Sequence, residues 1–229
     1  MSKKVLTVVA ALSLFALFGC NNRNETQAVA SENATSLKPM QQSYRGILPC
    51  ADCEGIETSL FLEDSGTWIM NQYYQGKKTS FASYGQWART ADKLVLTSNQ
   101  GEKQYFLPKE DSLVMLDSQG EPIQSSLNFT LKAVSLPLPT TPMAMKGEYT
   151  YMADAAIFKD CGSGKIYPVD LNAALQEAYL KVRGENVLPV LLQFDAHFIK
   201  QPKPDSDTLQ NALVSDGKVK FFPGKNCQS

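Results

Sequence analysis

Residues 56–74 read IETSLFLEDSGTWIMNQYY, and this stretch decides the class of fold. Two apolar runs, residues 56–62 and 67–74, flank Asp64-Ser65-Gly66, which is typical of a hairpin turn. Both runs are rich in aromatic and branched side chains and show no helical period, so each predicts a strand. The stretch therefore predicts an antiparallel hairpin.

The same alternation of apolar runs and turn residues continues to residue 133. Further strands are expected at residues 81–89, 93–97, 104–107, 112–116 and 123–131. Regular short strands of this kind predict an antiparallel meander that closes into a small barrel, because closure removes exposed strand edges. We therefore expect a mainly β protein whose N-terminal β-barrel domain spans residues 43–133.

A proline-rich linker is expected at residues 134–146, because Pro137, Pro139 and Pro142 lack the donor that a central strand needs. The C-terminal domain, residues 147–229, has strand patterns at 148–152, 155–159, 165–169, 187–199 and 218–222. Apolar residues at helical spacing lie between the third and fourth strands, with Asp170 as the expected N-cap and Gly184 as the expected end. This order predicts an OB-like five-stranded barrel with one helix.

The N-terminus reads as a lipoprotein signal peptide, residues 1–19. Two lysines precede an apolar run of about 14 residues, which is shorter than the roughly 20 needed to span a bilayer. The run ends in Leu17-Phe18-Gly19-Cys20, which resembles a lipobox, so we expect a lipid anchor on Cys20. Residues 20–42 are polar and without periodicity, and are expected to form a flexible tether with an end-to-end distance of about 26 Å.

The charge and composition of the chain limit the classes of function that it could have. The chain of 229 residues has a net charge of −1, and removing the two lysines of the signal peptide leaves 20 basic against 23 acidic residues, a net charge of −3. Nothing in this balance suggests a nucleic-acid partner. The sequence contains one histidine, no glycine-rich phosphate loop and no partnered nucleophile, so we expect no enzymatic activity.

Cys50 and Cys53 form the one sharp local motif, Pro-Cys-Ala-Asp-Cys. Two thiols at this spacing can close a small disulfide, exchange with other dithiols, or bind a soft metal such as Cu(I) or Zn(II). Redox catalysis is disfavoured, because Asp52 and Glu54 would raise the thiol pKa and no βαβ pattern surrounds the motif. The structural disulfide and metal binding both remain open.

The other candidate ligands and cysteines lie in the second half of the chain. His197 is expected to be a strand residue that faces solvent, and Met143 and Met145 are expected to pack between domains, although their spacing also suits copper. Once Cys20 is set aside, four cysteines allow three pairings, and the periplasm favours disulfides. A disulfide between Cys161 and Cys227 would hold the C-terminal tail against the second domain.

Several segments together resemble the NlpE (CutF) family of copper-homeostasis and envelope-stress lipoproteins. They are the lipobox, residues 46–58 (GILPCADCEGIET), residues 83–87 (SYGQW) and residues 151–156 (YMADAA). The resemblance implies a lipocalin-like N-terminal barrel, an OB-like C-terminal domain and a periplasm-facing lipid anchor in the outer membrane. It also maps the four family cysteines onto Cys50, Cys53, Cys161 and Cys227.

The resemblance further implies a sensor that activates the Cpx pathway through its inner-membrane sensor kinase, with roles in adhesion signalling and copper homeostasis. Failed lipoprotein transport would leave the anchor on Cys20 in the inner membrane, near the kinase. Failed oxidation would leave Cys161 and Cys227 reduced and loosen the second domain. No cofactor is required, although copper could bind at the CxxC motif, and a homodimer is possible. Two alternative functions are left open: a Cu(I)-binding lipoprotein and a lipocalin-like carrier of an apolar ligand.

Overall fold

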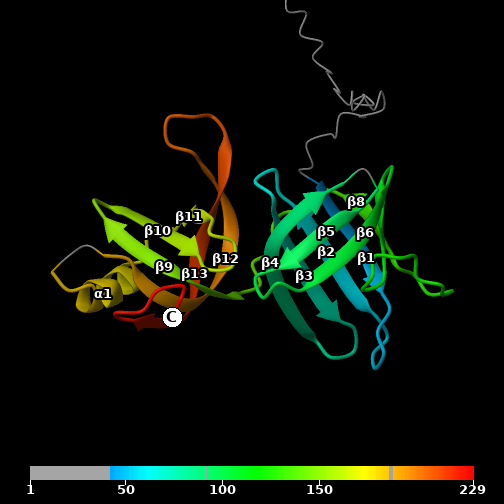
Figure 1. The fold of residues 1–229 in the computed structure, drawn as a ribbon, viewed down its shortest axis with the longest axis horizontal. Helices are drawn as coiled ribbons and strands as arrows, with labels where there is room; N and C mark the ends of the chain where they lie inside the picture. The colour runs from blue at the N-terminus through cyan, green and yellow to red at the C-terminus, as the bar shows by residue number, and fades with distance from the viewer. Residues whose placement is uncertain (1–41, 91, 186–187) are drawn as a thin grey trace, which may run out of the picture. The chain divides into compact units, whose positions relative to one another are not determined.

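A computed structural model describes residues 42–229 apart from residues 91 and 186–187 (Figure 1). The strands of the first sheet are β1 (Gln42–Leu48), β2 (Ile56–Leu62), β3 (Thr67–Tyr74), β4 (Thr79–Arg89), β5 (Leu94–Ser98), β6 (Lys103–Lys109), β7 (Ser112–Met115) and β8 (Thr130–Val134). The second part comprises β9 (Met143–Met152), β10 (Ala155–Asp160), β11 (Ile166–Pro168), α1 (Ala173–Val182), β12 (Val190–Pro202) and β13 (Leu209–Phe222). No helix of the described residues is long and apolar enough to cross a bilayer.

The first eight strands form a closed antiparallel barrel, as the sequence predicts. Each strand pairs with the next along the chain, and β8 returns to pair with β1 through Tyr44 opposite Ala133. The interior is filled by large apolar side chains that form one cluster: Tyr44, Leu48, Leu60, Leu62, Trp68, Met70, Leu94, Leu96, Phe106, Leu113 and Leu131. The barrel is thus held together by a side-chain core and by closure of its hydrogen-bonded sheet.

The halves of β2 and β3 next to their connecting turn are buried on both faces. Successive side chains of a strand point to opposite faces, so Leu60 and Leu62 fill the barrel whereas Phe61 points outward. Phe61 and Ile69 join a second cluster that contains the core of the C-terminal domain. This two-sided burial explains why residues 60–62 and 68–70 are continuously apolar.

The C-terminal strands form a five-stranded sheet in the order β11-β10-β9-β12-β13. A parallel bridge between Val169 and Leu213 brings its two edges together, and the Asp170 amide donates to the Leu213 carbonyl at 2.7 Å. Helix α1 covers one end, where the Tyr179 ring meets the Tyr149 ring edge-on at 5.3 Å. This arrangement confirms the expected OB-like domain with one helix.

The N-cap of α1 differs from the prediction. Asn172, not Asp170, caps the helix, and its side chain accepts the Leu175 amide at 3.0 Å. Asp170 lies two residues before the N-cap position, because the bond from its backbone amide to the Leu213 carbonyl keeps residue 170 in the sheet and the helix begins only at Ala173. The expected end is correct, because Gly184 follows the C-cap Arg183 with a φ of +70°, a conformation that favours glycine.

Several strand boundaries also differ from the prediction, most of all at β13, which begins at Leu209 instead of residue 218 because residues 209–217 continue the pairing with β12. The strand expected at residues 123–131 is wrong in its first part, because only β8 (Thr130–Val134) pairs with both β7 and β1. In the preceding loop Leu127 is exposed, and the Asn128 side chain donates to the Ile47 carbonyl at 2.8 Å. Strand β9 begins at Met143, inside the segment expected as linker, because Met143 pairs with Ala196 of β12.

Candidate functional site

The CxxC motif lies in the loop between β1 and β2, where Cys50 and Cys53 form a disulfide with a Cα–Cα distance of 5.3 Å. The loop passes close to the end of the barrel, since a Cβ at Gly55 would lie 2.5 Å from the Ile47 methyl. The Gly55 carbonyl accepts the Gln75 amide at 3.0 Å. The barrel therefore fixes the loop on its C-terminal side, while Asp52 remains exposed.

Asp52 gives this loop its charge. Lys77 donates to its carboxylate at 2.7 Å, and this hydrogen bond, followed by the charge of the ammonium group, lowers the Asp52 pKa. Ligand atoms of Cys50, Asp52 and Cys53 all lie within 4.8 Å of one another. Sulfur atoms in a disulfide are poor metal ligands, so a soft metal would bind only after both cysteines are reduced. Lys77 would then compete with the metal for the Asp52 carboxylate.

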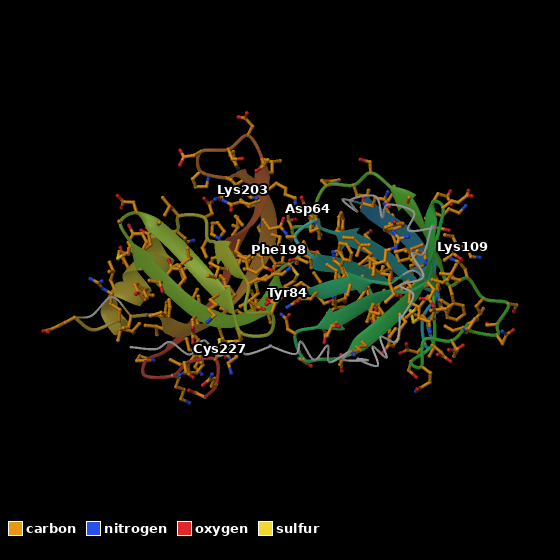
Figure 2. The ribbon with its side chains drawn as sticks, turned by 45° about the horizontal axis from the view of Figure 1, so that its top comes forward. Asp64, Tyr84, Lys109, Phe198, Lys203 and Cys227 are labelled. Atoms are coloured by element: carbon orange, nitrogen blue, oxygen red, sulfur yellow. A yellow bond between two sulfur atoms is a disulfide. The ribbon has the colours of Figure 1, made fainter. Side chains whose placement is uncertain are left out.

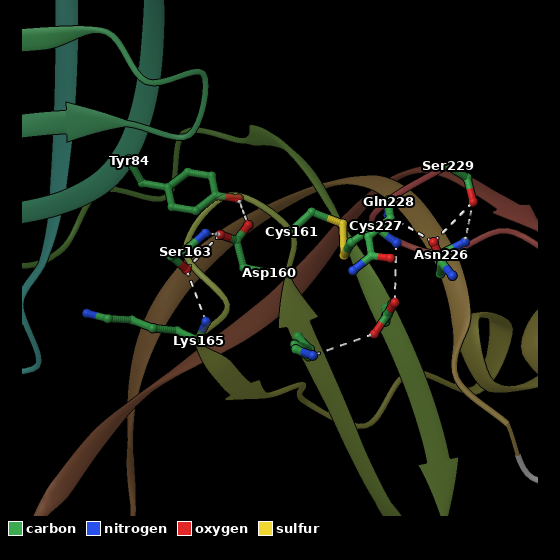
Figure 3. Close-up of a disulfide and its surroundings, with 11 residues drawn as sticks. Tyr84, Asp160, Cys161, Ser163, Lys165, Asn226, Cys227, Gln228 and Ser229 are labelled. Atoms are coloured by element: carbon green, nitrogen blue, oxygen red, sulfur yellow. Dashed lines mark hydrogen bonds and ion pairs between the residues drawn. A yellow bond between two sulfur atoms is a disulfide. The ribbon is translucent and has the colours of Figure 1, made fainter.

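The second disulfide joins Cys161, just after β10, to Cys227 in the C-terminal tail, with a Cα–Cα distance of 5.2 Å (Figure 3). The Cys161 amide donates to the Lys146 carbonyl at 3.0 Å, and the Cys227 amide donates to the Glu148 carboxylate at 3.2 Å. Both partners belong to β9. The bond therefore fixes the tail against the middle of the second sheet.

The residue before Cys161 connects this disulfide to the barrel. Asp160 is 1% exposed, and its Oδ1 accepts the hydroxyl of Tyr84 from barrel strand β4 at 2.6 Å. Its other oxygen accepts the amide and the hydroxyl of Ser163, each at 2.7 Å. Burial, and then the Asp160 charge, raise the Tyr84 pKa well above its usual value, so Tyr84 stays protonated and donates.

Further contacts surround Tyr84. Its ring meets that of Phe198 edge-on at 5.5 Å, and both residues are labelled in Figure 2. Lys165 donates to the Ser65 carbonyl and to the Thr67 hydroxyl, and Lys200 forms a salt bridge with the largely buried Glu63. These contacts join the β2–β3 hairpin to β12 and to the residue just before β11.

The structure separates the predicted site residues into two groups. Cys50 and Cys53 form one centre, and Cys161 and Cys227 form the other. Cys20, the expected lipidation site, lies outside the described residues.

The remaining candidate ligands belong to neither centre. Met143 and Met145 are buried in the core, as expected of packing residues. His197 lies in strand β12 as expected, but the expectation that it faces solvent is wrong. Its side chain is 12% exposed, because Asp216 covers it with both carboxylate oxygens 2.9 Å from Nδ1.

Sequence reasoning missed the contacts between the barrel and the second sheet. Tyr84 and Asp160 are 76 positions apart, and no local spacing relates them. One signal was present: Phe61 and Ile69 lie at positions that alternation assigns to solvent. Apolar residues there indicate that another element covers this face of the barrel.

Two family models match the chain: the NlpE N-terminal domain at residues 44–126 and the NlpE C-terminal OB domain at residues 139–228. The lipoprotein NlpE of Escherichia coli K12 is 52% identical over 232 residues, covering 100% of this chain and 98% of that protein.

Two solved structures are also similar. The crystal structure of the Cpx pathway activator NlpE from E. coli is 54% identical and covers 83% of this chain and 100% of that chain, with a TM-score of 0.42. A putative lipoprotein from Shewanella oneidensis is 32% identical and covers 41% of this chain and 88% of that chain, with a TM-score of 0.37.

Proposed function

Because this chain belongs to the NlpE lipoprotein family, we propose that it is a non-enzymatic outer-membrane lipoprotein that activates the Cpx pathway when the cell envelope is stressed. The proposal has two inputs, the oxidation state of Cys161 and Cys227 and the membrane that holds Cys20. Its output is contact between the N-terminal barrel and the inner-membrane sensor kinase.

The observation that carries the redox input is the position of Cys161 next to Asp160. The disulfide fixes the tail on one side of this turn, and the buried Asp160–Tyr84 hydrogen bond holds the barrel on the other. A reduced pair would free the tail and let the turn at residues 160–165 move. Loss of the Tyr84 contact would then uncover the outer face of β2 and β3, including Phe61 and Ile69.

A stress reporter tests the redox input. Cys227→Ser should raise Cpx-dependent expression in cells that export lipoproteins normally, because Cys161 can no longer hold the tail. Cys50→Ser/Cys53→Ser is the matched control, since it removes a disulfide from another part of the chain. An unchanged reporter in the Cys227→Ser variant, at equal protein level, would eliminate this input.

The location input depends on the short tether expected at residues 20–42. With an end-to-end distance of about 26 Å, the folded part stays near whichever membrane holds the lipid. By resemblance to enteric lipoproteins, the residue after the acylated cysteine directs sorting, and Asn21 permits export to the outer membrane. Asn21→Asp should retain the protein in the inner membrane and raise the reporter, whereas retention without activation would refute this input.

A second candidate function is Cu(I) binding, and the clustering of Cys50, Asp52 and Cys53 favours it. Two thiolates suffice for a linear Cu(I) site once the disulfide is reduced. Anaerobic titration of the reduced full-length protein should give one Cu(I) equivalent that Cys50→Ser/Cys53→Ser loses and Cys161→Ser/Cys227→Ser keeps. Equal binding by all three proteins would place the copper elsewhere.

A lipocalin-like carrier role has less support. A carrier needs an open apolar interior, and the described barrel strands fill theirs with Trp68, Phe106 and several leucines. A lipid-extraction assay on the purified protein checks this directly, and we expect no co-purified apolar ligand.

A further inference from the structure

A cleft of about 450 Å³ lies where the two edges of the second sheet separate. Val169 of the β11 edge meets Leu213 of β13, but the strands part towards Ile166 and Asn211. These residues line the cleft together with Asp64, Ser65, Lys165, Tyr167, Lys203, Leu209 and Gln210. The volume is within the range of small-ligand and peptide sites.

Asn211, which lines this cleft, has an unpartnered side-chain amide. The residue is 7% exposed, both amide atoms are closed to solvent, and neither has a hydrogen-bond partner among residues 42–229 as described. A buried polar group without a partner destabilises the fold, so such groups call for an explanation. An amide that donates and accepts side by side is complementary to a peptide group.

Backbone hydrogen-bonding groups on both sides of the cleft also point towards it. The Leu213 carbonyl accepts from Asp170, so Leu213 turns its backbone towards β11, and alternation gives Asn211 the same orientation. On the other strand, Lys165 and Val169 bond to β10, so the intervening Ile166 turns its N–H and C=O away from β10. An extended segment placed between Ile166 and Asn211 would therefore meet free backbone groups on each side.

The charge of the cleft favours an acidic occupant. Lys165 and Lys203 both line it and neither forms a salt bridge within the described part of the chain, while Asp64 is the only acidic residue that lines it. The acceptors of Lys165 are neutral oxygens, so its charge is not compensated, and burial lowers its pKa. Figure 2 labels Asp64 and Lys203. The flanks are apolar, with Ile166 60% and Leu209 53% exposed.

We propose that the cleft between β11 and β13 binds an extended peptide segment of a partner protein that carries a carboxylate. The segment adds a strand between the two edges, its peptide group pairs with the Asn211 amide as that side chain turns towards the cleft, and its carboxylate meets Lys165 and Lys203. The site is distinct from both disulfides and does not depend on the proposed signalling role.

The test is selection from random octapeptides displayed with free carboxyl termini, using the full-length lipidated chain in detergent micelles. We expect enriched peptides to carry an aspartate or glutamate near one end, in addition to the terminal carboxylate that every library member has. An enriched synthetic peptide should bind Asn211→Leu at least tenfold more weakly, although this variant should melt at the same or a higher temperature because it removes an unpartnered polar group. No enrichment over a selection on Asn211→Leu would overturn the proposal.

A second variant keeps the test valid if Asn211→Leu folds poorly. Lys203 is exposed, so Lys203→Met should leave the melting temperature unchanged and weaken the peptide several-fold. Lys109→Met, which replaces an exposed lysine on β6, is the matched control and should bind normally. Displacement of the peptide by equal concentrations of acetate or inorganic phosphate would show a simple anion site and overturn the peptide assignment.

Discussion

Removal of the Cys161–Cys227 disulfide should destabilise the protein far more than removal of the Cys50–Cys53 disulfide. The two cysteines of the first pair are 66 positions apart, whereas those of the second are 3 apart. In the chain-entropy treatment, closing the longer loop reduces the entropy of the unfolded chain by an amount worth about 4.4 kcal/mol at 25 °C, and closing the shorter one about 1.9 kcal/mol. The expected difference is therefore about 2.5 kcal/mol.

Urea unfolding of Cys161→Ser/Cys227→Ser and Cys50→Ser/Cys53→Ser, each against the oxidised parent, measures this difference. Domains of roughly 60–100 residues lose about 4–8 °C of melting temperature per kcal/mol, so the first variant should melt roughly 20 °C lower if its domain unfolds separately. A smaller shift with a single transition would indicate that the shared core around Phe61 and Ile69 makes the two sheets unfold together.

Both double variants lack a covalent bond and gain two serines, so they differ mainly in loop length and in the contacts of the tail. Equal losses of unfolding free energy in the two variants would refute the entropic account, and would also remove the physical basis for redox sensing at Cys161.

Three other perturbations probe the contacts between the sheets and their packing. Tyr84→Phe removes the hydrogen bond to the buried Asp160 and should cost about 1.5–3 kcal/mol in urea unfolding, and a loss below 0.5 kcal/mol would contradict a strong contact. Burial raises the Tyr84 pKa above its value near 10 in the unfolded chain. The stability that protonated Tyr84 gives to the fold is therefore complete below about pH 10 and is lost as the pH rises above it. The parent should lose unfolding free energy between about pH 9 and 11 more steeply than Tyr84→Phe does. Gly147→Ala places a Cβ 2.4 Å from both the Lys159 carbonyl and the Phe158 ring, so it should cost at least about 1–3 kcal/mol, and a parent-like melting temperature would show that β9 and β10 can separate.

Local sequence patterns predicted most of the fold. The apolar runs at residues 56–62 and 67–74 coincide with β2 and β3, because the turn at Asp64-Ser65-Gly66 and the composition of the runs act over a few residues. The helix was located by its apolar spacing, but its cap was misplaced. Aspartate and asparagine are equally good capping residues, and the choice depends on where the helix starts: the backbone contact of Asp170 with Leu213 keeps residue 170 in the sheet, so Asn172 caps the helix.

The features of the candidate site also divide into those that local sequence predicts and those that only the fold brings together. By itself the sequence determined the class of each domain and the position of the CxxC loop between two strands, since these follow from the propensities of neighbouring residues. Only the tertiary structure decided that Asp160 meets Tyr84, that His197 is covered by Asp216 and that Asn211 lines a cleft with its amide unpartnered. Such contacts depend on how separate strands align in space, and residues far apart in the chain carry no local pattern that encodes that alignment.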